Sequence, residues 1–386
     1  MKIFSLHEPK LDGDEIFNVN KCLKTGWLSP SGNFVKIFQT KLENFTKSNL
    51  VLTNSGTSAL HLSLILSNVK KNTEVMVPTM SFIATINVVL YLGCHPIFFD
   101  CQKNNPNLDI FKVIQFLKKN TFRKNGNTYN KKTKKKISAI ILTHVFGNVL
   151  EFNNLKIICR KYNIKIIEDA AEALGSKFNN QSHAGTQADF GILSFNINKI
   201  ITSSGGGAIF IKSKKDFLRA KLLIKQSKFN DIFFHHSEVG YNYGMSNISA
   251  AIGFSQLKKI KKILKMKKNI YLNYKKILDS KFTNIKMVEP SRKSNYWLNA
   301  ILIENNSYQN LKVLISRLIN QGIQARPIWY PCHKQKYLKN FQQYKLENAD
   351  KIYKKIICLP SSYFLSKNNI FRISRVFLNE TKTKKS

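Results

Sequence analysis

Short apolar runs recur along much of the chain, and each of them ends in polar or small residues. The runs have the length of buried strands and lie at 50–52, 75–78, 96–99, 138–142, 164–167, 190–193 and 208–211. Helical spacing of apolar residues appears between some of the runs, as in residues 153–162. This alternation of strand and helix predicts an α/β protein with a mostly parallel, doubly wound sheet.

The first helical pattern lies near the start of the chain, in residues 13–24. Ile16, Val19, Asn20 and Leu23 fall on one side of such a helix. We therefore expect a helix here that ends before the glycines and proline of residues 26–32.

The last third of the chain has a different pattern. A lysine-rich stretch over residues 249–278 has the spacing of one long helix, and a strand and a further helix are predicted after it. A chain of 386 residues is longer than a typical single domain. We expect a large α/β domain over residues 1–255 and a smaller C-terminal α+β domain over residues 256–386.

Charged residues follow two of the predicted strands directly. Asp169 and Glu172 follow the run at 164–167, and Lys199 lies in the loop after 190–193, shortly before the three glycines at 205–207. α/β enzymes place their chemistry at such strand ends. A lysine that binds pyridoxal phosphate covalently and an aspartate that keeps its ring nitrogen protonated would suit this arrangement. A solvent-facing lysine on a glycine-rich turn fits these residues about equally well.

A second candidate site lies where the run at 50–52 enters a small-residue turn and a helix. Backbone N–H groups at such a helix start point outward, which favours a bound anion such as phosphate. An ordinary helix cap by Ser55 or Thr57 explains the same residues equally well.

The net charge of +40 is large enough to suggest a nucleic-acid or membrane partner. The excess is mostly lysine spread along the whole chain, however, and we interpret it as a compositional bias. Residues 118–136 hold the densest run of basic residues, with Tyr129 as an aromatic that could stack on bases. We interpret this run as a solvated excursion and expect no nucleic-acid partner.

Six scattered cysteines form no metal-binding pattern, so we expect reduced thiols and no metal site. The first residues have no apolar core of a signal peptide, and no stretch is apolar enough for a membrane helix. We therefore expect a cytoplasmic protein without a membrane partner.

Several separated motifs resemble the sugar aminotransferases of the DegT/DnrJ/EryC1/StrS family, and the resemblance is closest to its LegC-like branch. The motifs are EDAAEALGS at 168–176, AGT at 184–186, SFNINK at 194–199 and GYNYGMSN at 240–247. The resemblance extends over nearly the whole chain. It implies a fold-type-I transferase that depends on pyridoxal 5'-phosphate.

The resemblance also implies roles for individual residues. Lys199 would hold the cofactor and shuttle protons during catalysis, while Asp169 would face the ring nitrogen. Glu172 would lie near the ring hydroxyl, where many relatives have Gln. The remaining cofactor contacts would be Gly56, Thr57 and Ser194 at the phosphate, Phe82 stacked on the ring, and Asn242 reaching the cofactor of the other subunit in a homodimer with shared active sites.

By the same resemblance, Trp27, Ser29 and Arg326 are candidate substrate contacts. Alternatives remain open, because Trp27 would also suit a buried anchor and Arg326 a structural ion pair. The chain departs from the family at Gly244, where relatives usually carry Arg, so an anion contact has been lost.

The implied reaction transfers an amino group from a donor, expected to be glutamate, to a nucleotide-linked 4-keto-6-deoxy sugar. A UDP-linked 2-acetamido sugar is the expected substrate, and the 4-amino product would serve surface glycan biosynthesis. Three alternatives are a sugar dehydratase on the same scaffold, which Lys199 disfavours, a non-catalytic relative and a basic nucleic-acid binder.

Overall fold

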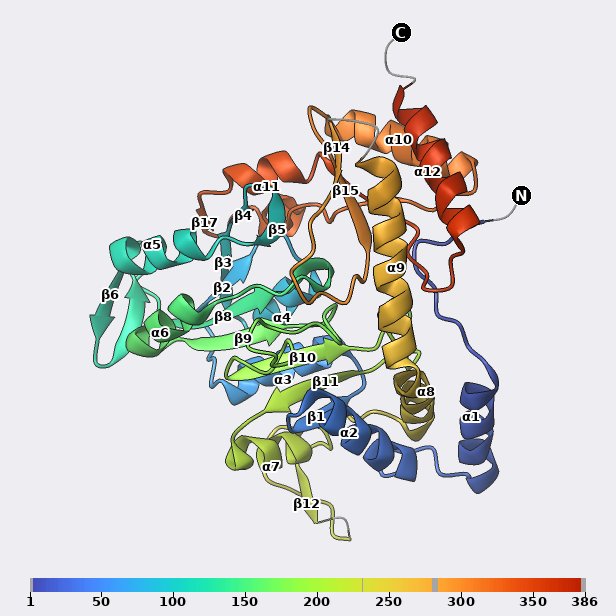
Figure 1. The fold of residues 1–386 in the computed structure, drawn as a ribbon. Helices are drawn as coiled ribbons and strands as arrows, with labels where there is room; N and C mark the ends of the chain where they lie inside the picture. Colours follow the sequence, from blue (N-terminus) through green and yellow to red (C-terminus); the bar gives the residue numbers. More distant parts are fainter. Residues whose placement is uncertain (1–2, 231, 280–283, 383–386) are drawn as a thin grey trace.

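The fold is described from a computed structural model over residues 3–230, 232–279 and 284–382. Its main element is an eight-stranded sheet in the order β1-β11-β10-β9-β8-β2-β3-β17 (Figure 1). Neighbouring strands are parallel from β10 to β17, and β11 is antiparallel to both β10 and β1. The strands are β1 (Leu50–Thr53), β2 (Glu74–Pro78), β3 (His95–Phe99), β8 (Ile137–Thr143), β9 (Lys165–Asp169), β10 (Phe190–Ser194), β11 (Gly207–Ile211) and β17 (Gln343–Tyr344). The predicted mostly parallel sheet is confirmed.

Helices cover both faces of this sheet. On one face, buried residues of three helices share a core with Val75, Ile141 and Ile167; these helices are α3 (Gly56–Leu66), α4 (Ala84–Tyr91) and α7 (Lys214–Leu223). On the other face, residues such as Ile140 and Ile166 pack with four helices: α2 (Asn33–Thr46), α5 (Ile110–Asn120), α6 (Asn153–Tyr162) and α8 (Asn247–Lys258). The doubly wound architecture therefore follows from strands that are apolar on both sides.

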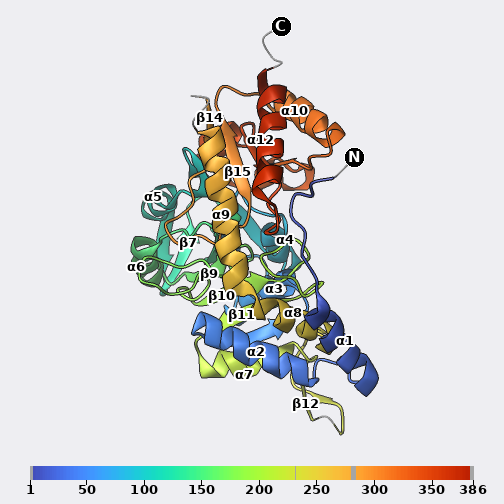
Figure 2. The same cartoon turned by 45° about the vertical axis from the view of Figure 1, so that its right-hand side comes forward.

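A second, antiparallel sheet lies in the C-terminal part and has the order β14-β15-β18-β16. Its strands are β14 (Ile285–Met287), β15 (Asn299–Ile303), β16 (Arg326–Pro327) and β18 (Ile356–Leu359). Figures 1 and 2 show the long helix α9 (Ile260–Leu278) running from this region toward the large sheet. The helices α10 (Tyr308–Asn320) and α12 (Lys367–Lys382) complete it.

Two short segments pair with a part of the molecule far from them in sequence. Phe4, near the N-terminus, pairs with Ile323 of the C-terminal part. Conversely, β17 of the C-terminal part joins the large sheet beside β3. The helix α11 (Glu347–Ile352) begins near the end of β3, because Asp100 accepts hydrogen bonds from the backbone N–H groups of Asn348 and Ala349. The proposed division near residue 255 stays a prediction.

The predicted helix at 13–24 exists as α1 (Gly13–Thr25), but the apolar side of this helix does not face the core. Ile16 and Leu23 are 63% and 55% exposed, whereas Glu15 and Asn18 are buried. Asn18 donates a hydrogen bond to Ser255 of α8. Polar contacts therefore hold α1 against α8.

Two further expectations need correction. The predicted long helix over 249–278 is divided into α8 and α9 at Lys259, which bonds Asp12 and Glu15 at the start of α1. The basic run at 118–136 contains a hairpin of β6 (Thr121–Lys124) and β7 (Asn127–Asn130) with Thr128 and Asn130 buried, so only part of it is a solvated excursion. The remaining short elements are β4 (Cys101–Gln102), β5 (Asn105–Leu108), β12 (Lys228–Asn230), β13 (His235–His236) and three turns of 3-10 helix, η1 (Val145–Gly147), η2 (Cys332–Lys334) and η3 (Lys336–Leu338).

Glu168, at the end of β9, is completely buried and accepts four hydrogen bonds. Three come from the backbone N–H groups of Gly185, Gln187 and Ala188, each at 2.6 Å. The fourth comes from His144 Nε2 at 2.9 Å. Because the Leu150 N–H donates to Nδ1 of the same ring, the imidazole proton lies on Nε2. Glu168 thus fixes both the end of β9 and the loop at 185–188.

We predict that Glu168→Ala lowers the free energy of unfolding by about 3–5 kcal/mol, because it leaves several buried donors without an acceptor. Urea denaturation followed by circular dichroism measures this change. Glu304→Ala is the control, since Glu304 forms an exposed ion pair with Lys286 and its loss should change stability by less than about 1 kcal/mol. Equal losses in the two variants would contradict the role given to Glu168.

Candidate active site

A cavity of about 290 Å³ lies at the carboxyl ends of β8, β9 and β10, beside the start of α3. Seven of the predicted site residues line it: Gly56, Thr57, Phe82, Asp169, Glu172, Ser194 and Lys199. They come from separate strands and loops, which the parallel sheet brings to one edge.

Lys199 lies in the loop after β10, and its side chain is 12% exposed. Its Nζ lies 3.4 Å from Glu172 Oε1 and 4.5 Å from the ring centre of Trp297. Trp297 also donates a hydrogen bond to the carbonyl oxygen of Asn198 at 2.7 Å, which holds the loop against the C-terminal part. The amine therefore projects into the cavity between a carboxylate and an indole face.

Asp169 is the last residue of β9 and is 4% exposed. Its Oδ2 accepts a hydrogen bond from the Thr85 hydroxyl at 2.7 Å, and its Oδ1 accepts one from the backbone N–H of Ala171 at 3.2 Å. Successive residues of a strand point to opposite sides of the sheet, so Asp169 faces the cavity side and Glu168 the other side.

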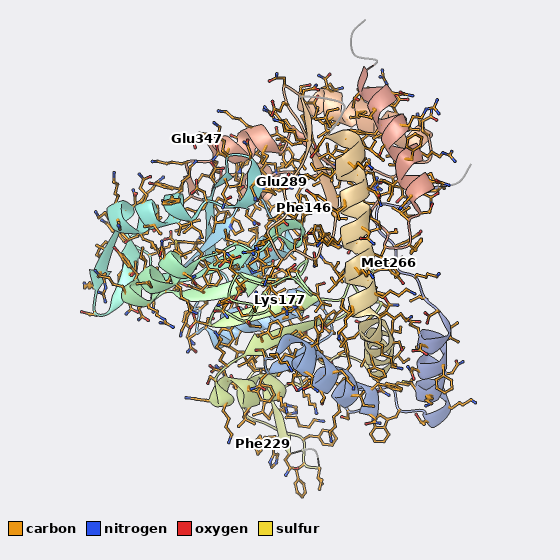
Figure 3. The ribbon with its side chains drawn as sticks, viewed as in Figure 1. Phe146, Lys177, Phe229, Met266, Glu289 and Glu347 are labelled. Carbon is orange, nitrogen blue, oxygen red and sulfur yellow. The ribbon has the colours of Figure 1, made fainter. Side chains whose placement is uncertain are left out.

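Glu172 is also 4% exposed and lies one turn beyond Asp169. Its Oε2 accepts a hydrogen bond from the backbone N–H of Phe146 at 2.8 Å. Figure 3 labels Phe146 in the interior of the molecule. Burial raises the pKa of Glu172 from 4.5 to about 7, although Lys199 and the Phe146 N–H act in the opposite direction.

The opposite end of the cavity is suited to an anion. Ser55 caps α3, whose first residues, Gly56 and Thr57, line the cavity, and the first turn of α3 carries no acidic residue. Ser194 lies close to Gly56, since a Cβ added to Gly56 would be only 2.9 Å from the Ser194 Cβ. Backbone N–H groups at a helix start and a serine hydroxyl are typical ligands of a phosphate group.

These donor sets fit pyridoxal phosphate. The helix start with Ser194 can hold the phosphate, Asp169 can accept a hydrogen bond from a protonated ring nitrogen, and the Lys199 amine can bind the cofactor covalently. Phe82 is 55% exposed and lines the cavity, as a residue that stacks on a ring would.

The other predicted site residues do not line this cavity. Trp27 is 57% exposed and lines a separate hollow between α1 and α2. Ser29 and Asn242 are exposed, and the Asn242 carbonyl accepts a hydrogen bond from Asn54. Arg326 is exposed in β16, where its guanidinium donates to the carbonyl of Ala325. Their suggested roles stay predictions.

Gly244 packs against Pro30, in the loop between α1 and α2. A Cβ at position 244 would lie 2.9 Å from the Pro30 Cβ. Asn247 holds the same loop, because its side chain donates to the Trp27 carbonyl at 2.7 Å and its N–H donates to the Leu28 carbonyl at 3.0 Å. A larger side chain at 244 would require this loop to move.

Sequence reasoning did not assign three residues that shape the site. Thr85 bonds Asp169, and Trp297 and Trp329 line the cavity from the C-terminal part. Trp329 lies three residues after Arg326, a predicted substrate contact, whereas nothing in the local sequence marked Thr85.

Within the described ranges, no group of three His, Cys, Asp or Glu residues could hold a metal ion. The six cysteines are buried and free. In the same part of the chain, no helix combines the length and the apolar character that crossing a membrane requires.

Comparison with known proteins identifies the family of this chain. The model of the DegT/DnrJ/EryC1/StrS aminotransferase family matches residues 9–377. The chain is 30% identical over 381 residues to the GDP-perosamine synthase of Escherichia coli O157:H7, covering 97% of each protein. It is 30% identical over 359 residues to a UDP-4-amino-4,6-dideoxy-N-acetyl-beta-L-altrosamine transaminase of Campylobacter jejuni, covering 91% of this chain and 90% of the relative.

The fold is likewise similar to a solved aminotransferase structure. Helicobacter pylori PseC, an aminotransferase involved in the biosynthesis of pseudoaminic acid, superposes with a TM-score of 0.88. The match covers 99% of this chain and 100% of PseC at 24% sequence identity. The predicted fold class is therefore confirmed.

The raised pKa of Glu172 makes stability depend on pH. The folded protein holds this proton up to about pH 7, whereas the unfolded chain loses it near pH 4.5. The contribution of Glu172 to the free energy of unfolding is thus fully present below pH 4.5 and is lost as the pH rises through 7. We predict that the free energy of unfolding of the cofactor-free protein, compared with that of Glu172→Gln, falls by about 2–3 kcal/mol between pH 5 and pH 8.

Denaturant unfolding of both proteins at a series of pH values measures this difference. Glutamine keeps the shape of the side chain and an oxygen that can accept the Phe146 hydrogen bond, so the comparison isolates the titration. Stability curves of the two proteins that run parallel across this pH range would contradict the shifted pKa.

Proposed function

Because the chain belongs to the DegT/DnrJ/EryC1/StrS aminotransferase family, we propose that it is a pyridoxal phosphate-dependent aminotransferase acting on a nucleotide-linked sugar. The arrangement of the cavity carries this proposal. One cavity is lined by a lysine amine, by a buried aspartate and by the start of α3, whose first turn carries no acidic residue. These groups match the three contacts that the cofactor needs, at its aldehyde carbon, its ring nitrogen and its phosphate.

The chemistry that pyridoxal phosphate supplies when bound is exchange of an amino group at its aldehyde carbon, with the ring accepting negative charge. Lys199 binds the cofactor and moves a proton between the reacting carbons through Nζ. Asp169, anchored by Thr85, keeps the ring nitrogen protonated. Gly56, Thr57 and Ser194 bind the phosphate, and Phe82 stacks on the ring.

The acceptor in this proposal is the 4-keto group of a nucleotide-linked 6-deoxy sugar, and the donor is glutamate. The names of the relatives support an amino sugar product linked to UDP or GDP. We favour a UDP-linked 2-acetamido sugar, in agreement with the resemblance to the LegC-like branch. The product would then enter surface glycan biosynthesis, after a reaction that we place in the cytoplasm.

We further propose a homodimer with shared active sites. Asn242 and Trp27 lie outside the cavity of their own chain, so both are available to a partner subunit. Apolar side chains that a second chain could cover are exposed nearby in sequence, among them Phe229 and Phe233 at 60% and 67%. Figure 3 labels Phe229 at the lower end of the molecule, on the hairpin of β12 and β13 that follows α7.

The alternative activities are weaker explanations of the site. A dehydratase on this scaffold would be expected to lack the lysine found at position 199. A non-catalytic relative would have no reason to keep Lys199, Asp169 and an open phosphate end together. The change at Gly244 removes one anion contact and leaves the cavity residues in place.

We predict that the protein incubated with pyridoxal phosphate forms a visible absorption band that shifts on addition of glutamate. Borohydride should fix the cofactor on Lys199, which peptide mass spectrometry identifies. Lys199→Ala should lose the fixed adduct and at least about 100-fold of the rate of amino transfer to a 4-keto sugar nucleotide. Lys177→Ala, which changes an exposed lysine, is the matched control.

The outcomes separate the parts of the proposal. An adduct on Lys199 without a response to glutamate would point to another amino donor. No adduct in the wild-type protein would refute the assignment as an aminotransferase.

Shared sites predict complementation between two inactive variants. If Asn242 acts in the partner's site, a Lys199→Ala chain and an Asn242→Ala chain form a mixed dimer with one intact site. An equal mixture of the two chains should then recover about a quarter of wild-type activity. Homodimers of each variant are the controls, and no recovery on co-expression would show that Asn242 does not act across the interface.

A further inference from the structure

The Glu172 carboxylate has an unusually restricted set of partners. Its Oε2 accepts the Phe146 N–H, and its Oε1 lies 3.4 Å from Lys199 Nζ. Among the described residues, no other hydrogen bond reaches this carboxylate in the structure. Lys199 is therefore the partner of Oε1.

Glu172 is fixed in this position from both sides. Its backbone carbonyl accepts a hydrogen bond from the Asn295 side chain at 2.7 Å. Phe146, which donates to the carboxylate, has the left-handed backbone angles φ 58° and ψ 21°, which are rare for a bulky residue. The Phe146 ring packs against Trp329 with 5.6 Å between ring centres. The carboxylate is thus held inside the protein, beside Lys199.

Three ionisable groups influence this carboxylate or respond to it. Lys199 comes from the loop after β10, Asp169 from the end of β9 and Cys358 from β18. Burial raises the pKa of the Cys358 thiol, so it carries no charge near neutral pH. Lys199 is then the cation that balances Glu172, and Asp169 adds a second negative charge to the same buried site.

Loss of the Lys199 charge would leave Glu172 without its balancing cation. Two carboxylates in a buried site do not both stay ionised readily, because burial and like charge both favour the protonated form. Asp169 keeps its hydrogen bonds from Thr85 and Ala171, whereas Glu172 has the Phe146 N–H alone. The proton released by Lys199 therefore has a nearby acceptor in Glu172.

We propose that Glu172 takes up the proton that the Lys199 ammonium group loses when its amine becomes reactive toward the cofactor, and keeps it as a carboxylic acid. This inference rests on the proposed function. One N–H bond of Lys199 breaks, its electron pair stays on the nitrogen, and one O–H bond forms at Glu172 Oε1. No further reactant is needed, and the net charge of the pair stays at zero.

The substitution Glu172→Gln separates this role from a structural one. An amide has the same shape and can accept the Phe146 hydrogen bond, but it takes up no proton near neutral pH. Glu289→Gln is the matched control, because it makes the same chemical change at an exposed carboxylate that bonds Tyr271 and Lys275.

The test follows covalent loading of the cofactor-free protein with pyridoxal phosphate. At pH 8, the infrared difference spectrum between loaded and cofactor-free protein should show a new carboxylic acid C=O band in the wild type and in Glu289→Gln. The band should be absent in Glu172→Gln. In addition, the ratio of the wild-type to the Glu172→Gln loading rate should rise about 10-fold between pH 6 and pH 8, as the ionised fraction of a group with a pKa of about 7 does.

Each result decides the matter. A carboxylic acid band that appears in the wild type and is absent in Glu172→Gln, together with the rising ratio of loading rates, supports the inference. Loading without the band, or a band that persists in Glu172→Gln, overturns this inference and leaves the proposed function standing. Failure of the wild type to load would overturn both.

Discussion

The active-site cavity depends on the buried carboxylate of Glu168, which no solvent reaches. A buried carboxylate is tolerated when donors surround it, and here three backbone N–H groups and His144 do so. These bonds join the end of β9 to the loop at 185–188 and to the end of β8. Since neighbouring strand residues face opposite sides, fixing Glu168 also fixes the direction of Asp169. Contacts on one face of the sheet thereby position the Asp169 carboxylate on the other.

The C-terminal part completes what the large sheet begins. Trp297 lies against the Lys199 amine and bonds the backbone of the same loop, and Trp329 lines the cavity beside Phe146. A lysine next to an indole face and a buried carboxylate is shielded from water, which strengthens the interactions among the three groups. The C-terminal part therefore shapes the surroundings of the Lys199 amine directly, although Lys199 and Asp169 belong to the large sheet and its loops.

The sequence predicted the strand ends well because each buried strand is a short apolar run that ends in polar residues. Seven predicted residues meet in one cavity for this reason. The direction of α1 was harder to predict, since a helical pattern shows which residues share a side but not which side faces the protein. There Glu15 and Asn18 are buried through bonds to Gln256 and Ser255, partners more than two hundred residues away in the chain. Thr85 is another long-range case, because its role depends on an aspartate 84 residues later.

Asp169 and Glu172 show how environment divides two similar groups. Both are 4% exposed and lie three residues apart, so burial and local sequence do not separate them. Asp169 has a hydroxyl and a backbone N–H on its two oxygens, and both donors stay in place whatever happens to Lys199. Glu172 relies on Lys199 at one of its oxygens, so the state of that oxygen must follow the state of the lysine. An aspartate with fixed donors is suited to holding a permanent charge, and a glutamate whose partner reacts is suited to exchanging a proton.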